Sequence, residues 1–127
     1  MPFVRISLLQ GQTPAYLKQV SDSIQAALVD SIGINPSDRL QIIEELTPEQ
    51  LRISKELVGV NHQNPVILLT ILLKTGRTLE MKKKLYQQIV THLKHNVGID
   101  SADVIIVLNE LPAENWSFGH GLATLVD

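Results

Sequence analysis

The first fifty residues contain two different hydrophobic periods. Residues 2–9 alternate between faces, which is typical of a strand: Val4, Ile6 and Leu8 share one face, and Phe3, Arg5, Ser7 and Leu9 share the other. From residue 14 onward the spacing becomes that of a helix, with Leu17, Val20, Ile24, Ala27, Leu28 and Ile32 on one face. Thr13 and Pro14 suit the beginning of this helix, and Gly33 suits its end. A second strand is predicted over about 39–45.

The pattern then starts again, which indicates an internal repeat. A strand over 66–73 leads to a helix over about 79–97, and Gly98 ends this helix as Gly33 ends the first. The segment that begins at Asp103 aligns with the one that begins at Asp38 at an offset of 65 residues. Further upstream we align Leu8-Leu9 with Leu72-Leu73, which treats Thr75 as one extra residue in the second copy. The pseudo-repeats therefore cover about 2–46 and 66–111.

Two β-α-β units of this kind define an α+β fold. Each crossover is expected to be right-handed with parallel strands, and the two units join most simply through antiparallel first strands. The expected result is a four-stranded mixed sheet with both helices on one face, in a single domain over 1–127 with a C-terminal tail at 112–127. Strands such as 66–73 are apolar on both sides, so the second sheet face needs a cover. A homo-oligomer that packs its sheets inward supplies one.

Composition narrows the functional classes. The chain has 127 residues, 44% of them hydrophobic, and a formal net charge of −2, which gives no electrostatic reason to expect nucleic acid or an anionic membrane as a partner. An RNA-binding ferredoxin-like domain is disfavoured because aromatic residues make up only 4%. The absence of cysteine excludes disulfides. No leader and no membrane span are recognised, so the default expectation is a cytoplasmic protein without cofactor.

Candidate chemistry begins at Pro2. Removal of Met1 leaves Pro2 as a secondary amine, and an α-amino group has an ordinary pKa of about 7.7–8.0 that burial or nearby cations lower. The predicted topology brings the start of the second strand, Asp38, and the end of the third, Lys74 to Arg77, to the start of the first. The two cations are placed to bind a substrate carboxylate and a developing enolate. Asp38 is placed to orient water or to raise the pKa of the proline.

Each of these residues also has an ordinary structural interpretation. Pro commonly follows Met without a role, Asp38 suits a turn, and Lys74 and Arg77 suit a solvated hairpin. It is their convergence on one end of the sheet that favours a site.

The same residues carry a family resemblance. Met1-Pro2, the pseudo-repeat, Asp38, the segment Leu73 to Thr78 and above all the segment Glu114 to Gly121 resemble the tautomerase superfamily, specifically its malonate semialdehyde decarboxylase-like branch. The resemblance implies a homotrimer that uses Pro2 as base or acid on small 2-keto, enol or unsaturated carboxylic acids. It also implies that Asp38, Lys74 and Arg77 are catalytic. Trp116 and Phe118 would form an apolar wall for the substrate, across a subunit boundary, or would anchor the tail on a neighbouring subunit.

Three functions are compatible with this sequence. The first is keto–enol tautomerisation of a small 2-keto or enol acid through Pro2. The second is decarboxylation of a 3-oxo acid, or hydration of an unsaturated acid, at the same site with a cationic Pro2. Lys74 stands where the decarboxylase pattern has an arginine, and this difference favours tautomerisation over decarboxylation. A retained Met1 would instead turn the Pro2 nitrogen into an amide and favour a non-catalytic trimeric binding protein. Pocket size is expected to depend on the loop 47–65, in which a short helix is conceivable after Thr47.

Other polar clusters point to surface positions rather than to sites. His92 and His95 are three residues apart on a predicted helix, but the sequence places no third ligand beside them. No metal is therefore expected. The run Lys82-Lys83-Lys84 is interpreted as a solvated helix face.

Overall fold

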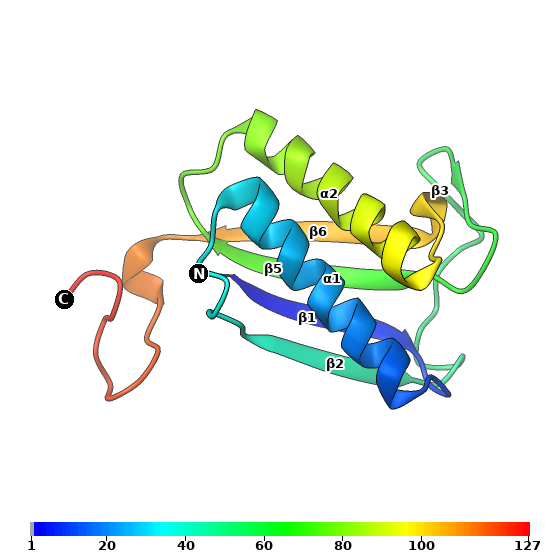
Figure 1. The fold of residues 1–127 in the computed structure, drawn as a ribbon, viewed down its shortest axis with the longest axis horizontal. Coiled ribbons are helices and arrows are strands. Elements are labelled where there is room, and N and C mark those ends of the chain that lie inside the picture. Colours follow the sequence, from blue (N-terminus) through cyan, green and yellow to red (C-terminus); the bar gives the residue numbers. More distant parts are fainter. Residues whose placement is uncertain (1) are drawn as a thin grey trace.

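The computed structural model describes residues 2–127 and contains one main sheet covered by two helices (Figure 1). The sheet has the strand order β2-β1-β5-β6. Its strands are β1 (Phe3–Leu9), β2 (Gln41–Leu46), β5 (Ile67–Lys74) and β6 (Val104–Leu111). The helices α1 (Pro14–Ile32) and α2 (Leu79–Val97) lie on the same face of the sheet (Figure 1). β1 pairs with β2 and β5 with β6 in parallel, while β1 and β5 are antiparallel. The predicted fold is confirmed.

Local signals set the ends of both helices. The hydroxyl groups of Thr13 and Thr78 accept hydrogen bonds from the backbone N–H groups of Tyr16 and Met81. The C-terminal caps, Gly33 and Gly98, have φ angles of 68° and 83°, a left-handed conformation that glycine adopts without a side-chain clash. These capping residues recur at the same places in both copies because each helix has the same two boundaries to satisfy.

The core lies between the helices and the face of the sheet that they cover. The strands supply alternate residues to it, and Val4, Ile6, Leu69 and Ile71 are 0–1% exposed. The remaining fully buried large apolar side chains come from β5 and both helices, namely Leu73, Val20, Ile24, Leu28, Leu85, Ile89 and Leu93. Burying each side chain of this size contributes about 1.5–3 kcal/mol, so this layer dominates the stability of the domain.

The two copies are related by a constant offset of 65 residues. The N–H of Gln10 donates to the carbonyl of Leu46 at 2.9 Å, and the N–H of Thr75 donates to the carbonyl of Leu111 at 3.0 Å. The strand registers repeat at the same interval. The alignment that made Thr75 an insertion is therefore wrong. It placed Leu8 opposite Leu72 in the repeat, although Leu8 faces the helices and Leu72 faces away from them.

The loop 47–65 differs from the expectation. In place of a short helix it contains one turn, in which the N–H groups of Gln50 and Leu51 donate to the carbonyl of Thr47. A small hairpin of β3 (Glu56–Leu57) and β4 (Val60–Asn61) follows. Because β2 runs parallel to β1, this loop leaves the sheet at the end opposite Pro2 (Figure 1). Within one chain the loop is therefore distant from Pro2, and it does not shape the pocket at that end of the sheet as the sequence analysis expected.

The second face of the sheet carries exposed apolar residues. Leu40, just before β2, is 42% exposed, Ile42 of β2 is 41% exposed, and Val107 of β6 is 51% exposed. Arg5 forms an ion pair with Glu44 at 2.7 Å in the same layer. Exposed apolar residues gathered on one sheet face are typical of an interface between subunits rather than of a solvated surface.

Candidate active site

The strand register places Pro2 between the two segments predicted to meet it. Phe3 pairs with Leu72 of β5, and Val4 pairs with Gln41 of β2. One residue earlier, Pro2 therefore lies beside the end of β5 and beside the turn that precedes β2. Pro2 is buried. The same register places Asp38 and Lys74 at this end of the sheet, as the sequence predicts. Met1 lies outside the described residues.

The turn that carries Asp38 is fixed from α1. The side-chain amide of Gln25 donates to the backbone carbonyls of Asp38 at 2.7 Å and of Pro36 at 3.3 Å, and Gln25 is only 5% exposed. The side chain of Asn35 accepts hydrogen bonds from Ser37. The Asp38 carboxylate itself accepts no hydrogen bond from any residue in the range 2–127. Its backbone is thus held while its side chain is left free for a ligand or for water.

Lys74 and Arg77 share a cavity. The guanidinium of Arg77 donates to the backbone carbonyl of Lys74 at 2.9 Å, which ties the end of β5 to the start of α2. Both side chains line a cavity of about 490 Å³, completed by Ile32, Thr75, Gly76, Met81 and Leu125. No acidic side chain is among these described lining residues, so the cavity suits an anion. Pro2 and Asp38 lie at the same end of the sheet but are not part of its lining.

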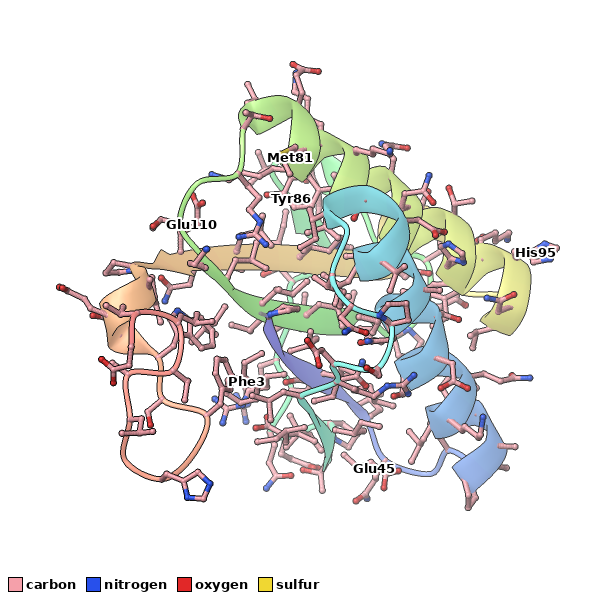
Figure 2. All side chains as sticks on the ribbon, turned by 60° about the vertical axis from the view of Figure 1, so that its left-hand side comes forward. Phe3, Glu45, Met81, Tyr86, His95 and Glu110 are labelled. Carbon is pink, nitrogen blue, oxygen red and sulfur yellow. The ribbon has the colours of Figure 1, made fainter. Side chains whose placement is uncertain are left out.

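A further pair of residues, which sequence reasoning missed, supports this loop. Lys82 of α2 forms an ion pair with Glu110 of β6, and their side chains are only 27% and 25% exposed. Figure 2 shows Glu110 beside the loop that joins β5 to α2. The hydrogen bond from Lys82, with further ones from the backbone N–H groups of Arg77 and Gly76, holds the pKa of the Glu110 carboxyl below its ordinary value. Lys82 is thus not part of a uniformly solvated lysine face.

The C-terminal tail begins at this end of the sheet and folds on itself (Figure 1). Trp116 is 8% exposed, and its ring stacks on Phe118 with centroids 5.6 Å apart. The indole N–H donates to the carbonyl of Leu111 at 3.4 Å. The aromatic pair does not line the cavity of Lys74 and Arg77, which receives Leu125 from the tail instead. The stacking anchors the tail, while a role of Trp116 and Phe118 as a substrate wall stays a prediction.

The histidines do not gather into a site. His92 pairs with Asp30 across the two helices at 3.0 Å, and His95 is exposed. Within residues 2–127 there is no group of three His, Cys, Asp or Glu residues arranged to hold a metal ion. In the same range no helix combines the length and the apolar character that a membrane crossing requires.

A duplicated β-α-β unit that forms a four-stranded mixed sheet with both helices on one face defines the class of tautomerase-like folds. Two family models of tautomerase enzymes match the chain, one over residues 38–119 and one over residues 2–61. The chain therefore belongs to the tautomerase family, which confirms the resemblance. Two curated relatives from Bacillus subtilis (strain 168) agree. The probable tautomerase YusQ is 30% identical over 100% of both chains. The probable tautomerase YrdN is 30% identical over 97% of this chain and 95% of its own.

Solved structures are similar over the whole length. One, described for the decarboxylase and hydratase activities of malonate semialdehyde decarboxylase, is 30% identical over 98% of this chain and 95% of its own, with a TM-score of 0.90. The FG41 malonate semialdehyde decarboxylase inhibited by 3-bromopropiolate also reaches a TM-score of 0.90, at 27% identity over 98% and 94% of the two chains. A fused 4-OT, described as a symmetric trimer, is 25% identical over 94% of both chains, with a TM-score of 0.78.

Proposed function

We propose that this tautomerase-family protein catalyses keto–enol proton transfer on a small 2-keto or enol carboxylic acid, with Pro2 as the group that carries the proton. The observation on which the proposal rests is the pairing of Lys74 and Arg77 in one cavity at the end of the sheet where Pro2 is buried. Removal of Met1 exposes the prolyl nitrogen as a secondary amine. A base at that position and an anion site beside it are the two elements that an enol acid requires.

Each residue has a defined part in the proposed reaction. Arg77 binds the substrate carboxylate through its guanidinium, and Lys74 stabilises the oxyanion of the enolate as it forms. The neutral amine of Pro2 takes a proton from one position and returns it to carbon at the other, so that the substrate is isomerised without net loss of atoms. The nearby cations lower the pKa of the amine because they disfavour its charged form. Asp38 hydrogen-bonds the amine or an intervening water and counters that effect.

Assembly completes the proposal. The exposed apolar face with Leu40, Ile42 and Val107 is covered when three copies pack their sheets inward. A trimer is supported by the similarity to the fused 4-OT that is described as a symmetric trimer. In that arrangement Trp116 and Phe118 lie near a subunit boundary and bound the substrate on its apolar side. A cytoplasmic location remains part of the proposal.

The experiment compares two forms of the protein that differ only at the start. Intact mass spectrometry identifies a sample without Met1 and a sample that retains it, and ketonisation of phenylenolpyruvate is followed by its ultraviolet absorbance at equal protein concentration. We expect turnover only without Met1, because the retained residue makes the Pro2 nitrogen an amide. Equal turnover in both samples, or none in either, contradicts proton transfer through Pro2. If neither sample turns over phenylenolpyruvate although the protein is a folded trimer, a binding protein on the same scaffold is favoured.

Substitution separates the binding site from the base. Arg77→Gln removes one charge-assisted contact and is expected to lower kcat/KM about ten- to hundredfold, mainly through KM. Arg52→Gln is the matched control, because Arg52 is an exposed arginine whose side chain donates only to the carbonyl of Glu49 at 2.8 Å. If both variants lose activity equally, the Arg77 cavity is not the carboxylate site.

Decarboxylation of a 3-oxo acid is the second candidate, favoured by the TM-score of 0.90 to malonate semialdehyde decarboxylase. In this mode Pro2 is cationic and polarises the 3-oxo group while the carbon–carboxylate bond breaks and carbon dioxide leaves. The electron pair of that bond forms an enolate, which takes a proton at carbon from Pro2 to give the carbonyl product. The processed protein is incubated with malonate semialdehyde, and carbon dioxide release is measured against the ketonisation rate. If kcat/KM for carbon dioxide release from malonate semialdehyde exceeds kcat/KM for ketonisation of phenylenolpyruvate, decarboxylation is the principal reaction.

A further inference from the structure

The constant offset of 65 residues assigns a counterpart to every residue of the candidate site. Pro2 corresponds to Ile67, and Asp38 corresponds to Asp103. Lys74 corresponds to Leu9, and Arg77 corresponds to Gln12. All four counterparts line one cavity of about 260 Å³ at the opposite end of the sheet. The duplication has therefore produced two equivalent hollows in one chain, and only one of them carries the candidate active site.

The chemistry of the second cavity is opposite to that of the first. Leu9 and Gln12 replace the two cations, and no lysine or arginine is among its described lining residues. The nitrogen of Ile67 is a peptide amide and cannot act as a base. These features remove both the base and the anion site that the proposed isomerisation needs.

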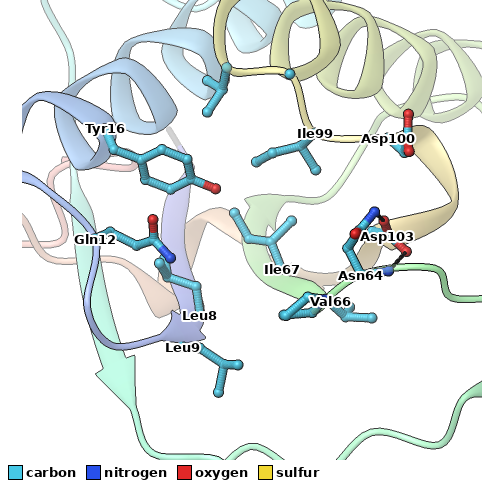
Figure 3. Close-up of a pocket in the computed structure, with 13 residues that line it drawn as sticks. Leu8, Leu9, Gln12, Tyr16, Asn64, Val66, Ile67, Ile99, Asp100 and Asp103 are labelled. Carbon is cyan, nitrogen blue, oxygen red and sulfur yellow. Dashed lines mark hydrogen bonds between the residues drawn. The ribbon is translucent and has the colours of Figure 1, made fainter.

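The polar groups that remain are a phenol, an amide and carboxylates. Figure 3 shows the ring of Tyr16 extending into the cavity beside Gln12, with Asp100 and Asp103 on the far side. Among the residues that the structure describes, no hydrogen bond involves the Tyr16 hydroxyl. Burial in this apolar setting raises the pKa of the phenol, which therefore stays protonated and neutral. Asp100 uses one carboxylate oxygen for Lys94 and keeps the other.

Asp103 stabilises the wall instead of the ligand. It is 1% exposed, and its oxygens accept hydrogen bonds from the backbone N–H groups of Gln63 and Asn64 and from the Asn64 amide, at 2.8, 3.3 and 3.0 Å. The segment before β5 is thereby fixed as one side of the cavity. Asp103, the counterpart of Asp38, thus stabilises the fold at this end of the sheet instead of facing a ligand.

We propose that this cavity is a second small-molecule site, without catalysis, that takes compact amines and rejects carboxylates. The apolar part of the ligand packs on Leu8, Ile67 and Ile99, and its ammonium group faces the Tyr16 hydroxyl and the remaining carboxylate oxygen of Asp100. The volume lies just below the roughly 300–1,000 Å³ of sites for drug-sized ligands, so the occupant contains about one ring. The proposal does not depend on the reaction at Pro2.

The test titrates benzylamine and benzoate, which have the same ring and opposite charges, into the assembled, ¹⁵N-labelled protein at pH 7. We expect benzylamine to shift the amide resonances of Gln12, Val66 and Ile99 to saturation, and benzoate to leave them in place. Gln12→Arg introduces the cation of the first site and is expected to weaken benzylamine about tenfold or more while allowing benzoate to bind. Tyr16→Phe is expected to weaken benzylamine about threefold to tenfold by removing one hydrogen bond.

Gln19→Arg is the matched control, because it makes the same charge change at an exposed position of α1 outside the cavity. Its affinity for benzylamine is expected to stay within about twofold of the original protein, since exposed charges at a distance are screened. Absence of saturable shifts with benzylamine, equal shifts with benzoate, or equal effects of Gln12→Arg and Gln19→Arg would each overturn the proposal. If the proposal holds, Gln12→Arg also leaves the ketonisation rate unchanged. A failure of this test can therefore be distinguished from a failure of the proposed function.

Discussion

Replacement of Asp103 by alanine removes the polar link between the turn that precedes β6 and the segment before β5. Asp103 is 1% exposed and accepts three hydrogen bonds from Gln63 and Asn64. Each bond to a charged acceptor contributes about 1.5–3 kcal/mol, which gives an upper limit of about 5–9 kcal/mol. Both donor residues are exposed, so water replaces much of what is lost. We therefore expect Asp103→Ala to lower the free energy of unfolding by about 2–4 kcal/mol.

Urea unfolding followed by circular dichroism measures this loss, with all variants at the same protein concentration because assembly contributes to stability. Asp100→Ala is the control, because Asp100 is 47% exposed in its pair with Lys94 and such surface pairs contribute about 0–1 kcal/mol. A loss for Asp103→Ala no larger than that for Asp100→Ala would refute the reasoning, because the buried hydrogen bonds would then have no net effect.

The same residue predicts a pH dependence. Burial tends to raise the pKa of Asp103, but hydrogen bonds from the Asn64 side chain and from the backbone N–H groups of Gln63 and Asn64 outweigh it, so that the pKa is lowered. A carboxyl whose pKa is lower in the folded state stabilises the fold above its unfolded value of about 3.9. The stability difference between the original protein and Asp103→Asn is therefore full at pH 6 and disappears as the pH falls below about 4. A difference that persists undiminished at pH 2 contradicts this account.

Three further substitutions test the site and the assembly. Gln25→Leu removes the hydrogen bonds that hold the turn of Asp38, and we expect a loss of about 1–2 kcal/mol in urea unfolding together with a lower ketonisation rate; unchanged values for both would contradict it. Glu110→Gln weakens the support of the loop that carries Arg77, so KM for phenylenolpyruvate should rise while circular dichroism stays unchanged. Val107→Glu places a charge on the exposed sheet face and should shift the mass measured by light scattering from trimer to monomer; an intact trimer would exclude this face as the interface.

The sequence predicts the fold well because the helix and strand signals are local and occur twice. Thr13 and Gly33 delimit one helix, Thr78 and Gly98 delimit the other, and in both cases the structure has the helix between them. The alternation of apolar residues also identifies which side of each strand faces the core. The sequence comparison fails only where the two copies are aligned upstream of Gly76. There Leu72 and Leu73 are adjacent leucines that point to opposite faces of the sheet, and Leu8 was aligned with the wrong one.

The candidate site is less predictable because its members interact over long distances in sequence. The run at residues 82–84 has no feature that separates Lys82 from its neighbours, and only the folded arrangement brings it to Glu110, 28 residues further on. Leu125 gives no signal either, since its place in the cavity depends on how the tail folds back. By contrast, the end of the sheet at which Pro2, Asp38 and Lys74 lie follows from strand direction alone.

The two aspartates illustrate why a repeated residue does not imply a repeated role. Asp38 and Asp103 occupy equivalent turns, and in both the aspartate N–H donates to the carbonyl three residues earlier, at 2.9 Å. The Asp103 carboxylate accepts hydrogen bonds from Gln63 and Asn64 in the segment before β5. The Asp38 carboxylate accepts no hydrogen bond from residues 2–127, and it lies at the end of the sheet with Lys74 and Arg77. Duplication thus supplied one carboxylate twice, and the neighbouring residues decide which copy fixes a loop and which is left available for chemistry.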